Sequence, residues 1–151
     1  KQREELRRFI EEHATAWAVG VATVQEIQQI NILHASMLAM QRAIEALPCM
    51  PERLLIDGNY YDPRPDEVEY HTIVKGDDRY LAIAAASILA KTHRDEYMTQ
   101  QAQEYPHYGW EQNKGYPTAQ HRAGIRQHGS CPLHRQGFQL LQPEPLFDLE
   151  R

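Results

Sequence analysis

The stretch RLLIDGN, residues 53–59, decides the expected fold, because its short apolar strand ends in Asp57 and a turn. A second strand is predicted over EYHTIVKG, residues 69–76, which is followed directly by Asp77 and Asp78. In α/β sheets, ligands bind at the carboxyl ends of the strands. We therefore expect Asp57 and Asp77 to come together at one edge of a sheet.

Helical patterns surround these strands, which predicts an α/β layer architecture. Residues 80–104 are rich in alanine and lack glycine and proline, so they predict one continuous helix. Apolar residues at spacings of three and four predict helix over 25–47, with Asn31 capping a second helical part. Two further helices are expected, an amphipathic one over residues 2–12 and one over residues 118–128 that ends at Gly129.

The remaining segments give weaker patterns. AWAVGVATV, residues 16–24, predicts a buried strand in which Gly20 allows a close approach, and residues 105–117 predict an aromatic-rich loop. No repeat or boundary is evident, so we expect one domain over residues 1–138 and a C-terminal tail over 139–151. Because a domain rarely opens inside a helix, we also expect a segment before Lys1.

Composition excludes several classes of protein. Hydrophobic residues make up 42% and charged residues 25% of the 151 residues, as in ordinary globular domains. No apolar run approaches the roughly 18 residues of a membrane span, and the charged N-terminus is not a secretory signal. Cys49 and Cys131 are too few for a disulfide framework, which favours a reduced, cytoplasmic setting.

The charge is distributed unevenly along the chain, whose net charge is −5. Residues 52–78 hold eight acidic and three basic residues, whereas residues 107–135 hold four basic residues, one glutamate and four histidines. A metal-dependent enzyme that acts on phosphate esters would show an acidic centre followed by a basic stretch. Chance patterning of a solvated surface would also produce it.

Asp57 and Asp77 are candidate ligands for a hard cation. Mg²⁺ takes oxygen ligands and binds through one or two carboxylates together with substrate phosphates. Two nearby carboxylates also need a cation to neutralise their repulsion. The alternative is that Asp57 bonds its own loop backbone and that Asp77 and Asp78 form a solvated acidic turn.

Two further groups could contact nucleic acid. Ser87, Lys91 and Arg94 share one helix face and could follow a phosphate backbone, unless Lys91 simply pairs with Asp95 in solvent. In KGYPT, residues 114–118, an exposed tyrosine could stack on a sugar or base, or could instead pack the loop onto the domain. The histidines at 121, 128 and 134 lack the spacing of a zinc motif.

Taken together, these motifs resemble bacterial ribonuclease HII in their order and spacing, from about Gln2 to Phe138. The segments that carry the resemblance are NILHASMLAMQRAI, LLIDGN, VKGDDR, AAASILAKTHRD, YGWEQNKGYPTAQH and HRQGF. The resemblance implies an RNase H-like α/β fold, with a mixed sheet and flanking helices, in the domain over residues 1–138. It implies a cytoplasmic endonuclease, expected to be a monomer without membrane contact. Such an enzyme cuts the RNA strand of RNA–DNA hybrids and cuts at ribonucleotides embedded in duplex DNA, by two-metal hydrolysis with Mg²⁺ or Mn²⁺.

The resemblance also assigns roles to individual residues. Asp57 matches the family's metal-ligating aspartate in IDG, and Asp77 matches a further acidic residue of its active site, so both are expected to be catalytic and metal-binding. Tyr116 matches the tyrosine that packs on the sugar beside the ribonucleotide junction. Other nucleic-acid contacts are expected from Lys114, Ser87, Lys91, Arg94, Asn31 and His34.

The sequence departs from the family at two places. The family's first strand, with an Asp–Glu pair followed by Gly-Arg-Gly, is not in this sequence, so the first strands of the fold are expected to be missing. Gly137 stands where the family usually has serine. Two other interpretations therefore stay open: a catalytically inactive nucleic-acid-binding fragment, or a DDE-type recombinase-like domain whose last acid would be Glu104.

Overall fold

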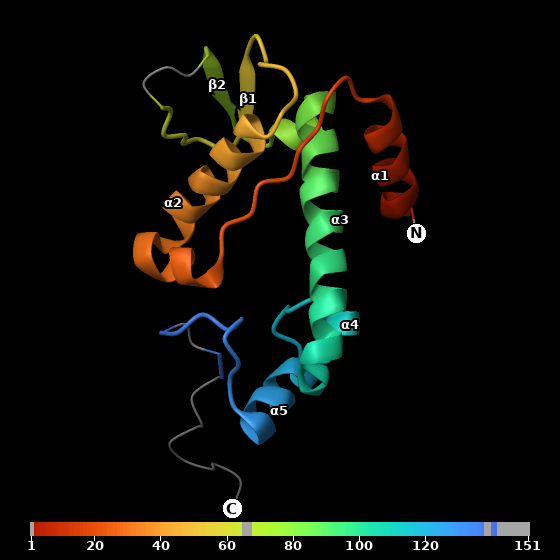
Figure 1. The fold of residues 1–151 in the computed structure, drawn as a ribbon, viewed down its shortest axis with the longest axis vertical. Helices are drawn as coiled ribbons and strands as arrows, with labels where there is room; N and C mark the ends of the chain where they lie inside the picture. The colour runs from red at the N-terminus through yellow and green to blue at the C-terminus, as the bar shows by residue number, and fades with distance from the viewer. Residues whose placement is uncertain (1, 65–67, 138–139, 142–151) are drawn as a thin grey trace, which may run out of the picture. The chain divides into compact units, whose positions relative to one another are not determined.

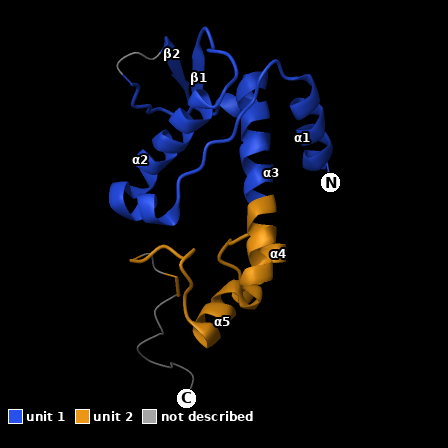
Figure 2. Cartoon of the chain, in the orientation of Figure 1, with its two compact units in different colours: residues 1–95 blue, residues 96–151 orange. Residues whose placement is uncertain are grey.

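The computed structural model describes residues 2–64, 68–137 and 140–141. The chain divides into two compact units, Lys1–Asp95 and Glu96–Arg151, which we call the N-terminal unit and the C-terminal unit (Figure 2). A single domain over residues 1–138 stays a prediction. The predicted tail over 139–151 lies outside the described residues, except for Leu140 and Leu141.

Two consecutive strands lie between helical segments along the chain, and this combination of a small sheet with flanking helices confirms the predicted α/β class (Figure 1). The elements in chain order are α1 (Gln2–His13), α2 (Val24–Glu45), β1 (Leu54–Asp57), β2 (Tyr70–Ile73), the 3₁₀ turn η1 (Gly76–Asp78), α3 (Leu81–Glu104), the 3₁₀ turn η2 (Pro106–Tyr108), α4 (Trp110–Asn113) and α5 (Ala119–His128). No helix in this described part of the chain has the length and apolar character needed to cross a bilayer.

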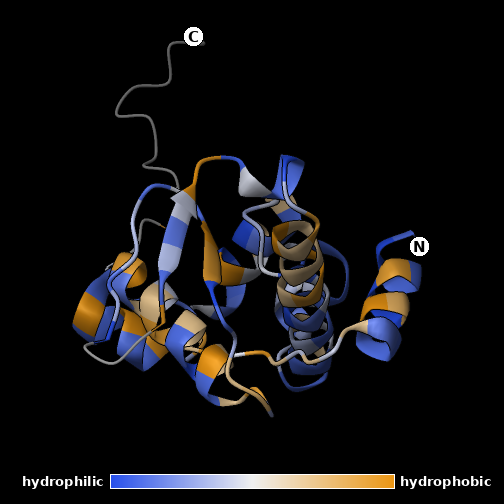
Figure 3. Cartoon of the chain, turned by 90° about the horizontal axis from the view of Figure 1, so that it is seen from above, coloured by the Kyte–Doolittle hydropathy of each residue, from blue (hydrophilic) through white to orange (hydrophobic). Residues whose placement is uncertain are grey.

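The sheet of the N-terminal unit is a parallel pair, in which Leu54 faces Tyr70 and Asp57 faces Ile73. Its apolar strand β1 is mostly orange in Figure 3, whereas β2 is largely pale or blue. The side chains that form the core beneath the sheet are Met37, Leu54, Ile56 and Tyr61. Because the strands run parallel, their carboxyl ends lie at the same edge.

Helix α2 bends at Asn31, as the predicted cap requires. Asn31 leaves the helical region at φ 65° and ψ 169°, and its Oδ1 accepts hydrogen bonds from the backbone N–H groups of Leu33 and His34. A side-chain oxygen that accepts from the second and third N–H groups of a helix is an N-cap. Asn31 therefore starts the longer second part of α2, which carries Met37 into the core.

The predicted strand over residues 16–24 is wrong, because residues 16–23 have no strand partner among the described residues. A strand needs a neighbour for its backbone hydrogen bonds, and the apolar pattern alone does not supply one. The predicted close approach at Gly20 is confirmed: a Cβ there would lie 1.9 Å from the Ala39 carbonyl oxygen and 2.6 Å from the Ala43 nitrogen. The segment therefore covers α2 as extended chain.

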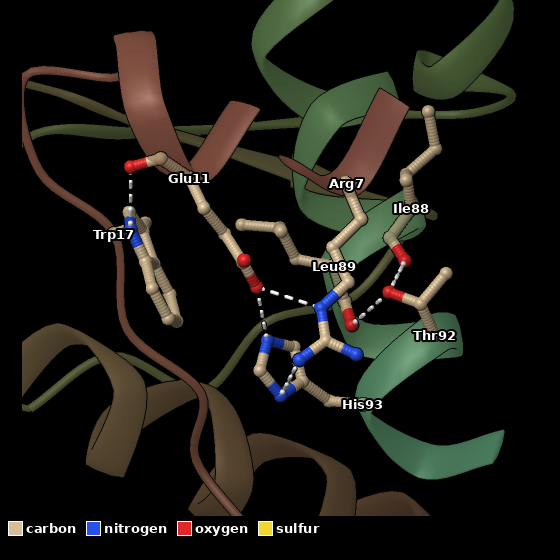
Figure 4. Close-up of polar contacts among 7 residues, drawn as sticks. All are labelled: Arg7, Glu11, Trp17, Ile88, Leu89, Thr92 and His93. Carbon is tan, nitrogen blue, oxygen red and sulfur yellow. Dashed lines mark hydrogen bonds and ion pairs between the residues drawn. The ribbon is translucent and has the colours of Figure 1, made fainter. Parts of the chain in front are cut away.

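Helix α1 contacts α3 through polar groups (Figure 4). Glu11 Oε1 accepts from Arg7 Nε at 2.7 Å and lies 2.9 Å from His93 Nε2, and the Trp17 indole N–H donates to the Glu11 carbonyl. These contacts hold the pKa of Glu11 below its usual range, mainly through the hydrogen bond from Arg7. The predicted apolar face of α1 is not buried, since Phe9 is 59% exposed.

The C-terminal unit has a second core, formed by Ala102, Tyr108, Trp110 and Ile125. The segment predicted as an aromatic loop, residues 105–117, contains the short helical turns η2 and α4. The predicted helix α5 is confirmed, with Thr118 as its N-cap and Gly129 at its end. Gly124 packs so closely on the His107 carbonyl that a Cβ would lie 2.2 Å from it.

Candidate functional site

Asp57 is exposed at the carboxyl end of β1. Its Oδ1 accepts a hydrogen bond of 2.8 Å from the backbone N–H of Gly76, which follows β2. The backbone N–H of Gly58 donates to the Ile73 carbonyl and keeps the two strand ends together. The alternative in which Asp57 bonds its own loop is therefore wrong, because its recorded contact is to the turn after the neighbouring strand.

Asp77 is placed by the turn after β2. Lys75 adopts the left-handed conformation at φ 54°, and Gly76 is buried so tightly that a Cβ would lie 2.5 Å from Ile83 Cδ1. The same Gly76 donates to Asp57, so Asp77 is the residue directly after the contact. Asp57 and Asp77 thus lie at the same end of adjacent parallel strands, and their predicted metal-binding role stays a prediction.

An open pocket of about 210 Å³ lies beside Asp77. Its lining residues are Arg3, Asp77, Ala84, Ser87, Ile88 and Lys91. Ser87 and Lys91 are one turn apart on α3, and Arg3 comes from α1, which Glu11 holds against α3. The structure therefore brings two predicted nucleic-acid contacts next to a predicted metal ligand, together with Arg3, which the motifs did not single out.

Arg94, the third predicted contact on α3, is exposed and lies 3.7 Å from the carboxylate of Asp95. The recorded ion pair of Asp95 is thus with Arg94. The alternative of an ordinary solvated helix face requires Asp95 to pair with Lys91. Asn31 and His34 are exposed at the bend of α2, and the Asn31 oxygen is occupied by its own helix. No recorded contact among the described residues joins Asn31 or His34 to the Asp57 edge.

Tyr116 projects from a tightly hydrogen-bonded loop in the C-terminal unit. Its N–H donates to the Asn113 carbonyl, its carbonyl accepts from the Thr118 N–H, and the preceding Gly115 has φ 82°. The Tyr116 side chain is 53% exposed, as stacking on a nucleotide requires. Asp57 belongs to the other unit, so the expected direction of the Tyr116 ring toward it stays a prediction.

Lys114 braces the same loop. Its Nζ donates to Thr99 Oγ1 on α3 and to the Glu111 carbonyl, and its backbone turns through φ 52° at the end of α4. These contacts hold the ammonium group within the C-terminal unit. The predicted contact between Lys114 and nucleic acid stays a prediction.

One buried cluster of the C-terminal unit could not be predicted from the spacing of its histidines. His121 and His134 are buried with their Nε2 atoms 3.0 Å apart, and the fully buried Trp110 donates from its indole N–H to His121 Nε2. Burial and the neighbouring His121 lower the pKa of His134. His128, the third histidine of the sequence pattern, instead stacks on His107 with ring centroids 3.9 Å apart.

The donor atoms at the strand edge suit a hard divalent cation, because they are carboxylate oxygens at an exposed position. One oxygen of Asp57 is oriented by Gly76, and no partner is recorded within the described chain for the other, Oδ2. Over the same described residues, no group of three or more histidine, cysteine, aspartate or glutamate side chains is gathered in a way that could hold a metal. The described part of the edge therefore offers Asp57 and the turn that carries Asp77 and Asp78, without a third ligand gathered beside them.

Known proteins resemble this chain over nearly its whole length. A family model described as Ribonuclease HII matches residues 1–141. A protein named Ribonuclease HII from Parabacteroides distasonis is 60% identical over 146 residues, which cover 97% of this chain and 72% of that protein. Another of the same name, from Phocaeicola vulgatus, is 55% identical over 148 residues, which cover 98% of this chain and 73% of that protein.

A solved structure supports the fold. The crystal structure of the ribonuclease H2 from Pyrococcus horikoshii matches with a TM-score of 0.71, covering 92% of this chain and 72% of that chain at 24% identity. The predicted RNase H-like fold is thereby confirmed. The family model and the relatives named Ribonuclease HII contradict the recombinase-like alternative. By the family model and by its relatives, this chain belongs to the ribonuclease HII family.

Proposed function

We propose that this protein is an endonuclease that hydrolyses the RNA strand of RNA–DNA hybrids and cuts at ribonucleotides embedded in duplex DNA. One observation carries the proposal: Asp57 and Asp77 lie at the same carboxyl edge of a parallel strand pair. In α/β sheets this edge is where ligands bind. Membership in the ribonuclease HII family supports the reaction type.

Asp57 and Asp77 would hold divalent cations, Mg²⁺ or Mn²⁺. Such ions, when bound in pairs, supply an activated water and stabilise the leaving 3′-oxygen of the phosphodiester. The Gly76 N–H donates to one oxygen of the exposed Asp57 carboxylate and thereby orients the carboxylate. Because this donor is a backbone group, the orientation of Asp57 depends on the turn after β2.

The groups that would contact the phosphate backbone lie in the pocket beside Asp77. Lys91 and Arg3 bring positive charge to it, and Ser87 adds a hydroxyl. Ammonium, guanidinium and hydroxyl groups are the side chains that bind phosphate oxygens and set the register of a nucleic acid. In the C-terminal unit, the exposed Tyr116 ring would stack on the sugar beside the ribonucleotide.

The proposal is tested by cleavage of three labelled substrates: an RNA–DNA hybrid, a DNA duplex with one ribonucleotide, and an all-DNA duplex. We expect the first two to be cut with Mg²⁺ or Mn²⁺, neither to be cut after chelation, and the all-DNA duplex to stay intact. Cleavage of the all-DNA duplex, or cleavage that survives chelation, would contradict the proposal.

The second candidate is nucleic-acid binding without catalysis. It is favoured by the observation that no group of three or more histidine, cysteine, aspartate or glutamate side chains among the described residues is placed to hold a metal ion. Fluorescence anisotropy with the same three substrates separates the two candidates. Tight binding of the hybrid without cleavage at any metal concentration would favour the binding protein.

Size-exclusion chromatography of the same sample tests the expected monomer.

A further inference from the structure

The buried histidine pair of the C-terminal unit has a defined proton arrangement. His121 and His134 are each about nine-tenths buried, at 7% exposure, and their Nε2 atoms are 3.0 Å apart. Two ring nitrogens at this distance need one proton between them, because two lone pairs or two N–H groups would repel. The other contacts of each ring show which nitrogen carries that proton.

The partners of His121 fix its tautomer. Its Nδ1 lies 3.0 Å from the Tyr116 carbonyl oxygen, which can only accept a hydrogen bond, so Nδ1 carries a proton. In a neutral ring, Nε2 is then the acceptor. The Trp110 indole N–H, which can only donate, points at that nitrogen from 3.2 Å and agrees with this assignment.

The partners of His134 fix the opposite tautomer. The backbone N–H of Cys131 donates to His134 Nδ1 at 3.0 Å, and the Cys131 thiol sulfur lies 3.2 Å from the same nitrogen. Nδ1 is therefore the acceptor, and Nε2 carries the proton. The two tautomers are compatible where the rings meet, because His134 Nε2–H donates to His121 Nε2.

We propose that His134 and His121 are positioning residues for Tyr116, linked in one ordered chain of hydrogen bonds from the Cys131 backbone to the Tyr116 carbonyl. The proposal rests on the proposed function for the claim that the Tyr116 ring contacts nucleic acid. Tyr116 is 53% exposed, and its ring extends from its backbone toward solvent, so the position of that backbone contributes to the direction of the ring. That backbone is held by the Thr118 N–H and by His121.

The chain requires both rings to be neutral. A proton added to His121 Nε2 would face the N–H groups of His134 and Trp110, and a proton added to His134 Nδ1 would face the Cys131 N–H. The other titratable groups that face the pair are the Cys131 thiol and Tyr108, whose ring lies edge-on to both histidines. Burial raises the pKa of both groups, which keeps them neutral as well.

The first test is direct and independent of nucleic acid. Long-range ¹H–¹⁵N correlation spectra of the ¹⁵N-labelled full chain at neutral pH distinguish the two neutral tautomers of each histidine. We expect His121 to be protonated at Nδ1 and His134 at Nε2. Any other tautomer pair, or a shift pattern in which added Zn²⁺ binds both rings, would overturn the proposal.

The second test uses a matched pair of variants. The amide of His134→Gln reaches the position of Nε2 and still donates to His121, whereas the amide of His134→Asn reaches only the position of Nδ1 and cuts the link. Both lose the ring contact with Tyr108, and His134→Gln also loses the acceptor for the Cys131 N–H, which His134→Asn keeps. His128→Gln is the control, because His128 is an exposed histidine of the same unit that stacks on His107.

The readout is the dissociation constant for a DNA duplex with one ribonucleotide, measured by anisotropy at a temperature where circular dichroism shows all variants folded. We expect His134→Asn to weaken binding about three- to tenfold, which is part of the roughly 5- to 150-fold that one stacked aromatic contributes. His134→Gln and His128→Gln should stay within about twofold of the parent. Equal affinities for His134→Asn and His134→Gln would overturn the proposal.

One further variant separates failure of this proposal from failure of the proposed function. If Tyr116→Ala binds the duplex as tightly as the parent does, the assigned role of Tyr116 is wrong, and the positioning proposal falls with it even when the tautomers are as expected. If Tyr116→Ala weakens binding and His134→Asn does not, only the positioning proposal is wrong.

Discussion

The carboxylate edge and the Tyr116 loop are held in opposite ways. At the edge, Asp57 is exposed and its recorded contact is one backbone hydrogen bond, from Gly76. In the loop, the backbone of Tyr116 alone takes part in three, with Asn113, Thr118 and His121. A metal ligand must keep its oxygens accessible to ions and substrate, whereas an aromatic ring that contacts a substrate benefits from a backbone held in one position.

The two regions also differ in their electrostatics. At the edge, Asp77 lines an open pocket together with Arg3 and Lys91, where salt screens the charges. The loop depends on neutral hydrogen bonds within a buried cluster, where His134 resists protonation. Removing a group at the edge should therefore change chemistry and salt dependence, and removing a group behind the loop should change geometry and pH dependence.

The largest effect is expected for Asp57→Asn. The amide oxygen can still accept from the Gly76 N–H, but the charge that holds a cation is gone. Turnover on a duplex with one ribonucleotide should fall roughly 10²–10³-fold, the usual loss when one charge-stabilising group is removed, with an unchanged circular dichroism spectrum. Asp62→Asn is the control for a lost acid in the same acidic segment. Cleavage by Asp57→Asn near the parent rate would show that another residue holds the metal.

Tyr116→Ala is expected to lower turnover on the same substrate by about 10- to 100-fold, because stacking on a nucleic-acid unit is worth about 1–3 kcal/mol and misplacement of the reacting phosphate adds to the loss. Binding should weaken less than turnover falls. Tyr116→Phe keeps the ring and should retain most of both. A loss of activity that is matched by a loss of folded protein would instead show that the tyrosine only pins its loop.

Lys91→Gln should weaken binding only about two- to fivefold and to a similar degree for hybrid and all-DNA duplexes. Phosphate contacts carry no sequence information, and each one contributes about one unit to the slope of log affinity against log salt. The measurement is anisotropy over a series of salt concentrations, with Lys75→Gln as the matched lysine outside the pocket lining. If the slope for Lys91→Gln equals that of the parent, Lys91 does not contact a phosphate.

The smallest effect is expected in the pH dependence of stability. The pKa of His134 is lowered from 6.5 in the folded state, mainly by burial, so below that pH the unfolded chain binds more protons. The contribution of His134 to the free energy of unfolding should thus be constant above pH 6.5. It should fall as the pH drops from 6.5 toward the lowered pKa of the folded state. Urea titrations at several pH values should show a flatter profile for His134→Gln. An equal slope in the variant would show that the pKa of His134 is not lowered by folding.

Local signals made most of the fold predictable. Period and composition located β1, β2 and α3, and the Asn31 cap was predicted from its place before the longer part of α2. The meeting of Asp57 with the turn before Asp77 could also be predicted, because parallel strands end at one edge. These features depend on residues close in sequence or on one simple rule of sheet geometry.

Features that depend on tertiary contacts could not be predicted. The apolar pattern of residues 16–24 indicated a strand, but no pattern can show whether a neighbouring strand is present. The histidine pair joins residues 13 apart through a buried contact, and its spacing matches no motif.

Gly137, a departure from the family's usual serine, has φ 73°, a conformation that glycine adopts without strain.

Gly20 illustrates what an extended segment without strand partners can still do. Its backbone lies directly on the turn of α2 between Ala39 and Ala43, so close that no side chain fits. We expect the segment to restrict the access of water to the Ala43 amide, so hydrogen–deuterium exchange at that position should report local opening of the segment and of α2 together. A slowly exchanging Ala43 amide would report the stability of a piece of chain that has no regular structure of its own.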